Sequence, residues 1–308
     1  MQTLGIGLLV AFIVSAFGAG SASASKFTVN TFGQYKYCPY ENPETTECFT
    51  GITLGGKNGG YFQLGSVLIK LSKPIVLQGG IAPGPDEANG YYKVVPAARG
   101  GKTLESPVLK IPGGLNVITP SIQQEAGWPQ SLKESFKEAK KNKEANAFAE
   151  IELAGGNQLF EDPDAISSEH LILRDAYGFK LPMKVKITSP WLTKLGGGPC
   201  LVGNDEHPVI QLLTTEKPGF LTSVDFSDDF KSVDLVTTLV DLGWPIEPAG
   251  GPSGCGGGES EAFVDEALRI ALRIGQESGG KGLTVLSGHL YDTFNIAKVK
   301  ELDEKGEL

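Results

Sequence analysis

Three histidines, His170, His207 and His289, limit where hydrolytic chemistry could take place in this chain. A Ser-His-Asp triad needs one of these rings beside a serine hydroxyl and a carboxylate, and no serine lies in a G-x-S-x-G turn. His289 is followed by Asp292, but alternation along a strand would put His289 and Tyr291 on one face and Asp292 on the other. A hydrolase that uses His207 or His289 is therefore one hypothesis, which requires the fold to bring a serine and an acid to the ring.

The densest polar cluster is Asp205, Glu206 and His207, which lies after Cys200 and before the strand expected from Pro208. A disulfide at Cys200 would hold this loop still, as binding loops are often held, although ordinary turns have the same composition. We treat these three residues as a candidate binding loop.

Two further acidic groups suggest chemistry that their spacing does not support. Glu161, Asp162 and Asp164 offer oxygens for calcium but lack the spacing and the glycine of an EF-hand loop. Asp228 and Asp229 are neighbours whose side chains diverge, whereas a glycosidase needs two carboxyls that face each other across ~5 to 10 Å. Solvated turns and helix caps are the structures we expect at both places.

The segment AARGGKT ends like a phosphate-binding loop, but Pro96 stands where that motif requires its first glycine. Gly100 to Thr103 are therefore predicted to form a turn. Together these motifs predict no catalytic residue, no cofactor and no metal site, and thus a protein without enzymatic activity.

Four cysteines, Cys38, Cys48, Cys200 and Cys255, allow three disulfide pairings. We predict Cys38 with Cys48, because CPYENPETTEC contains prolines and turn-forming residues and closes a compact loop; Cys200 then pairs with Cys255. Zinc is the alternative partner of four cysteines, but no C-x-x-C pair exists to form a ligand knuckle.

The first 24 residues predict an export signal, since a short apolar run ends in small residues with an A-x-A pattern at Ala22 and Ala24. An uncleaved anchor is the competing interpretation, because no Lys or Arg precedes the run. A secreted or cell-surface protein is expected, with no membrane span after cleavage. The net charge of -9, from 27 basic and 36 acidic residues, argues against nucleic acid as a partner.

Composition along the chain predicts a mainly β fold, an antiparallel sandwich or barrel stabilised by disulfides, with two accessory helices at about 129–146 and 260–277. We expect a signal peptide over 1–24, a β region over 25–125, a helical connector over 126–146 and a second β region with one helix over 147–308. In YFQLGSVLIKL the apolar residues alternate, with a break at Gly65 and Ser66 that would suit a β-bulge.

Both helices are predicted from an apolar stripe at helical spacing. The first carries Leu132, Phe136 and Ala139, and the second carries Phe263, Ala267, Ile270 and Ile274. The expected role of the second helix is to cover the open end of the β sandwich or barrel.

Five segments of the chain carry a resemblance to a known family: KLPMKVKITSPWLTKLGGGPCLVGNDEHPVIQLLTT around Cys200, FGQYKYCPYENP, KPIVLQGG, GCGGG and GHLYD. The chain resembles a family of exported proteins of high-GC Gram-positive bacteria. The shared residues are turns, cysteines and core positions, so the resemblance transfers no activity and no catalytic site.

The leading functional hypothesis is binding or adhesion at the cell envelope, with a cell-wall or surface component as a candidate partner. The second is carriage of an apolar small molecule in a β cavity lined by strand residues such as Val67, Ile69, Val185 and Ile187. A filled, dry core would argue against the carrier hypothesis.

Overall fold

Antiparallel strands dominate the structure, a computed structural model that describes residues 29–56, 58–83, 92–119, 127–155, 167–168, 178–214, 220–227, 231–241, 250–275 and 284–308. The predicted mainly β fold is confirmed. In these ranges the strands are β1 (Glu47–Thr53), β2 (Gly60–Leu64), β3 (Val67–Lys70), β4 (Val76–Pro83), β5 (Tyr92–Pro96), β6 (Leu104–Glu105), β7 (Leu109–Lys110), β8 (Phe148–Leu153), β9 (Ser167–Ser168), β10 (Gly178–Thr188), β11 (Cys200–Val202), β12 (Val209–Thr214), β13 (Phe220–Phe226), β14 (Ser232–Asp241), β15 (Pro252–Ser253) and β16 (Thr284–Thr293).

The strands form one antiparallel sheet that curls back on itself into an incompletely closed barrel, with no strand pairing between β6 and β8 among the described residues. Pairing runs continuously from β8 through β10, β12, β14, β16 and β1 to β4, and β6 pairs with the far edge of β4. β6 then lies beside β8, which brings the ring back to its start. Strands from both sides of the predicted connector over 126–146 therefore hydrogen-bond into one network.

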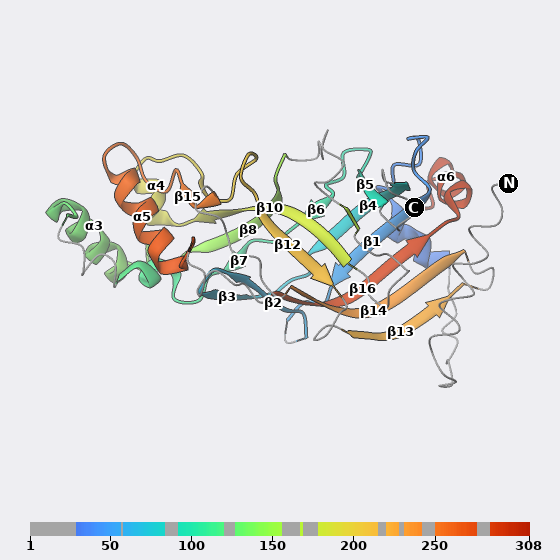
Figure 1. The fold of residues 1–308 in the computed structure, drawn as a ribbon, viewed down its shortest axis with the longest axis horizontal. Helices are drawn as coiled ribbons and strands as arrows, with labels where there is room; N and C mark the ends of the chain where they lie inside the picture. The colour runs from blue at the N-terminus through green and yellow to red at the C-terminus, as the bar shows by residue number, and fades with distance from the viewer. Residues whose placement is uncertain are drawn as a thin grey trace.

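The helices lie at the two ends of the strands. Figure 1 shows α3, α4 and α5 gathered at one end and α6 at the other. Their bounds are α3 (Gln130–Lys141), α4 (Pro190–Lys194), α5 (Ser260–Leu272) and α6 (Ile296–Glu304), with 3-10 helices η1 (Val29–Tyr35) and η3 (Gly114–Ile118).

The first predicted helix is confirmed and is shorter than expected. α3 buries the predicted stripe of Leu132, Phe136 and Ala139. It ends at Lys141 rather than near 146, because the chain turns there and Lys143 adopts a positive φ of 61°. The buried face packs on α4, where the rings of Phe136 and Trp191 lie 4.8 Å apart.

The second predicted helix is also present, but the predicted stripe was partly wrong. α5 buries Val264, Ala267, Leu268 and Leu272, so the buried face is rotated from the expected one. The helix ends at Leu272 because Arg273 adopts a left-handed conformation with φ 56°. Ile274 is fully buried, but it lies beyond the helix end.

The prediction of one strand with a β-bulge over YFQLGSVLIKL is wrong, because this segment forms two strands. The chain reverses at Gly65 and Ser66 and forms the hairpin of β2 and β3, with Leu64 opposite Val67. Gly65 has φ 57°, and a positive φ at the first central position is what a tight two-residue turn of type II′ requires. The break therefore makes a turn and not a bulge.

The core is formed by the inward faces of the barrel strands and the helix faces at one end. Alternation along β10 places Met183, Val185 and Ile187 inside. A second, small core contains Tyr35, Cys38, Cys48 and Val299, outside the barrel wall.

Candidate functional site

An apolar cavity of about 70 Å³ lies inside the barrel, between the sheet formed by β1, β4 and β16 and the facing strands β8 and β10. Its lining is almost entirely apolar, so it excludes an ion or a strongly hydrated group. The lining residues are Gly51, Ile52, Thr53, Phe62, Ile75, Leu77, Leu104, Ile151, Leu181, Met183, Thr237, Thr284, Leu286, Gly288, His289 and Leu290.

Two glycines help to leave this space open. A Cβ built on Gly288 would lie 2.1 Å from the carbonyl oxygen of Ile52, so the backbone approach itself excludes a side chain there. A Cβ on Gly51 would meet Leu290 and the backbone of Leu77 at 3.7 Å, which is ordinary contact. A side chain at Gly51 would therefore fit and would occupy part of the cavity.

The strand residues proposed from the sequence as cavity lining lie elsewhere in the core. Val67, Ile69 and Ile187 line a gap of about 10 Å³ beneath Leu268 and Leu272 of α5. That volume is about what one water molecule needs. α5 thus covers this end of the barrel, as its sequence predicted, and the core there is filled.

Of the three histidines, His289 has an acidic partner. Its Nδ1 lies 3.1 Å from Oδ1 of Asp234 on the neighbouring strand β14, and its ring stacks on Tyr291 with ring centres 5.6 Å apart. Burial raises the pKa of Asp234 above its usual value, although the hydrogen bond from His289 acts in the opposite direction. Within the described ranges, no serine hydroxyl bonds to this ring.

A pair of buried carboxyls, Glu47 and Asp292, was missed in the sequence. Asp292 points away from His289 and Tyr291, as alternation predicted, and is almost fully buried. The Glu47 carboxyl donates a hydrogen bond to Asp292, whose Oδ1 has no partner among the described residues. Burial raises the pKa of Asp292 to about 7 and that of Glu47 well above its usual range. Alternation in GHLYD was the one sequence signal for this pair.

The candidate loop forms a turn organised by Asn204, whose side-chain oxygen accepts from the backbone N–H groups of Glu206 and His207. Asp205 reaches away from the other two. Its carboxylate accepts from Lys184 Nζ at 2.9 Å and from the backbone N–H of Gly155. These contacts lower the pKa of Asp205. The loop therefore contributes Asp205 to the outer face of β10, and Glu206 and His207 are exposed.

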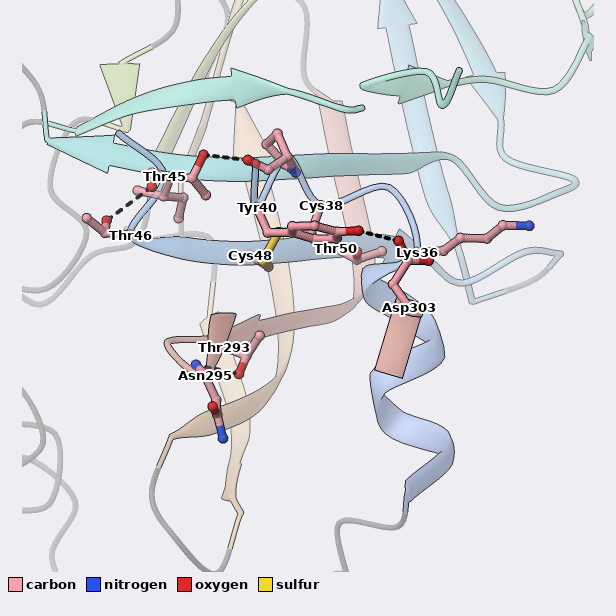
Figure 2. Close-up of a disulfide and its surroundings, with 12 residues drawn as sticks. Lys36, Cys38, Tyr40, Thr45, Thr46, Cys48, Thr50, Thr293, Asn295 and Asp303 are labelled. Carbon is pink, nitrogen blue, oxygen red and sulfur yellow. Dashed lines mark hydrogen bonds between the residues drawn. A yellow bond between two sulfur atoms is a disulfide. The ribbon is translucent and has the colours of Figure 1, made fainter. Parts of the chain in front are cut away.

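Both predicted disulfides are formed, Cys38 with Cys48 and Cys200 with Cys255. The first fastens the segment after η1 to β1. Figure 2 shows this disulfide beside Tyr40, whose hydroxyl donates to Asp303 of α6. That hydrogen bond raises the pKa of Tyr40. The guanidinium of Arg99 lies 4.4 Å from the centre of the Tyr40 ring.

Several expected sites lie outside the described residues: the signal segment 1–24, Glu161, Asp162, Asp164, His170, Asp228 and Asp229. In the part of the chain that the structure describes, no three His, Cys, Asp or Glu side chains are grouped closely enough to hold a metal ion. Within the same part, no helix has the length and apolarity needed to cross a bilayer.

Comparison with known proteins found no protein-family model, no curated protein and no solved structure that matches this chain. The cavity and the side chains around it are therefore the features of the molecule that bear on its function.

Proposed function

We propose that this protein carries a small apolar molecule, or the apolar part of one, inside its β barrel. The observation that supports the proposal is the cavity of about 70 Å³ with its apolar lining. An apolar space in an otherwise close-packed interior costs stability, and this cost is offset when an apolar ligand occupies it. The two disulfides fit a protein that works in an oxidising environment outside the cell.

Two other hypotheses stay predictions without a specific observation that favours them over carriage. Adhesion at the envelope would need a surface with a defined partner. A hydrolase at His289 would need a nucleophile in addition to the Asp234 partner.

The test is native mass spectrometry of the protein purified from the culture medium of its own host. We expect excess mass that extraction with an organic solvent removes. Gly51→Val should lose that mass, because valine would occupy the cavity. Gly127→Val is the matched control, since a Cβ at Gly127 meets nothing within 4 Å and lies outside the cavity lining.

The shift of Tm in the presence of benzene tests the proposal even if the natural ligand is lost during purification. Benzene should raise the Tm of the wild type and of Gly127→Val, because a ligand that binds the native state stabilises it. It should not raise the Tm of Gly51→Val. A bare wild-type polypeptide together with an unchanged Tm in benzene would overturn the proposal.

A further inference from the structure

The barrel wall has a slot between β6 and β8. The short β7 pairs with β8 only at Phe148 and Ala149, and β6 pairs with β4. Along Glu150 to Leu153, no strand pairing joins β8 to β6 within the described residues, although the two strands lie side by side. Elsewhere in the ring, neighbouring strands are joined by hydrogen bonds.

A groove of about 350 Å³ occupies this slot. Leu104 of β6 and Ile151 of β8 line both the groove and the inner cavity, so these two side chains lie between the two spaces. The complete lining of the groove is Lys102, Leu104, Ser106, Glu150, Ile151, Glu152, Leu153 and Lys184. The slot thus lies between an apolar interior and a polar exterior, and a ligand that spans it would have to displace these two side chains.

The volumes of the inner cavity and the groove indicate which part of a ligand each space would hold. The inner cavity is several times the roughly 10–15 Å³ that one water needs, which suits a short alkyl chain or a single ring. The groove is about five times larger and has hydrogen-bonding side chains on its rim. The larger, polar part of a ligand would lie there.

Charges around the groove balance. Lys184 stands opposite Glu152 and Lys186 opposite Glu150 in the register of β8 and β10. Asp205 forms an ion pair with Lys184 at 2.9 Å, and Lys102 lies on the β6 side. The charged residues that line the groove are two lysines, Lys102 and Lys184, and two glutamates, Glu150 and Glu152, and this balance favours neither a cation nor an anion.

From this arrangement we propose that the ligand is an electroneutral amphiphile that spans the slot, with a short apolar end in the barrel and a hydroxyl-rich or amide-rich body in the groove. Ser106, Glu150 and Glu152 would hydrogen-bond the polar body. The proposal rests on the proposed function, because it needs the cavity to accept an apolar group.

The probes are hexyl β-glucoside, hexyl sulfate, hexyltrimethylammonium and benzene, measured with the full mature chain by calorimetry and by shift of Tm. Hexyl glucoside should bind about ten-fold more tightly than either charged hexyl compound. The double variant Glu150→Ala/Glu152→Ala should weaken the binding of hexyl glucoside about ten-fold through lost hydrogen bonds and should leave the Tm shift in benzene unchanged.

The matched control is Glu134→Ala/Glu138→Ala, which removes the same charge from exposed positions of α3. It should change neither measurement. Gly51→Val should abolish both, because each probe needs the inner cavity.

Each further outcome has a defined meaning. If benzene binds but hexyl glucoside does not, or if the glutamate variant binds hexyl glucoside as the wild type does, the slot proposal is wrong and the cavity proposal stands. Equal or tighter binding of a charged hexyl compound overturns the electroneutral assignment. If no probe binds the wild type, the proposed function itself fails.

Discussion

Glu47 and Asp292 hold a proton inside the protein over a pH range in which the unfolded chain has lost it. Ordinary unfolded-state pKa values of these groups are about 4, whereas burial raises the folded-state pKa of Asp292 to about 7 and that of Glu47 well above its usual range. The native state therefore binds more protons than the unfolded state above about pH 4. The contribution of the pair to stability is present below that pH and falls as the pH rises through about 7.

We predict that Asp292→Asn reduces this loss. The free energy of unfolding of the wild type should fall between about pH 4 and pH 7 more steeply than that of the variant, since the variant has one titrating group of the pair fewer. Urea unfolding at a series of pH values measures both slopes.

Glu206→Gln is the control for this comparison, because Glu206 is exposed on the turn after β11. Its curve should follow that of the wild type. Parallel curves for Asp292→Asn and the wild type would show that Asp292 does not carry the raised pKa.

At the scale of elements, the hairpin of β2 and β3 is fastened to the end of α5. The backbone N–H and hydroxyl of Ser66 donate to the carbonyl oxygens of Leu272 and Ala271. These are among the carbonyls that a helix leaves without an internal partner. The turn therefore fixes both the end of α5 and the position of the hairpin.

Gly65→Ala should destabilise the protein by about 3 kcal/mol or more. A methyl group there would lie 2.0 Å from the carbonyl oxygen of Leu272, at a positive φ of 57°. Gly113→Ala has a similar φ of 75° and open space, so it should cost only about 1 kcal/mol. Equal costs in chemical denaturation would contradict the close contact with α5.

The two disulfides should differ in their effect on stability. The Cys200–Cys255 link closes 55 residues and the Cys38–Cys48 link closes 10, which corresponds to about 4 and about 3 kcal/mol from chain entropy. Replacing Cys200 and Cys255 by alanine should therefore lower the denaturation midpoint more than replacing the other pair. The reverse order in urea titrations would show that local contacts, and not loop length, determine how much each disulfide stabilises the protein.

The spacing of apolar and turn-forming residues predicted those elements that are specified within a single segment of the chain. α3 follows from the spacing of its apolar residues alone, and the disulfide pairing follows from the turn-rich loop before Cys48. Gly65 and Ser66 are a two-residue turn signal, but apolar residues alternate on both sides of them, and this pattern resembles one continuous strand. α6 lacks a strong apolar stripe, and the end of α5 depends on Ser66, far away in the sequence.

The candidate site could not be predicted in the same way. The cavity exists because Gly51, Gly288 and several strands meet across the barrel, and no segment contains that information. The same is true of Glu47 and Asp292, which approach through the pairing of β1 with β16.

At the scale of the whole molecule, the cavity lowers the stability of the empty protein, because the side chains that line it lack packing contacts on that side. Gly51→Val should raise the free energy of unfolding by about 1 kcal/mol in the absence of ligand, through cavity filling and the strand preference of valine. Gly127→Val should give no such gain. A loss of stability at Gly51 would show that the neighbouring side chains leave no room for valine.

The place of β16 in the barrel bears on how the chain folds. This strand pairs with β14, β1 and β2, and the backbone N–H of Gln63 bonds to the Thr284 hydroxyl across 221 residues of sequence. Until the last strand is available, β1, β2 and β14 present unpaired edges, which readily join to other chains. Contacts of such long range form slowly, so a chain that stops short of β16 would aggregate rather than fold, and a complete chain depends on protection of these edges until its C-terminal part arrives.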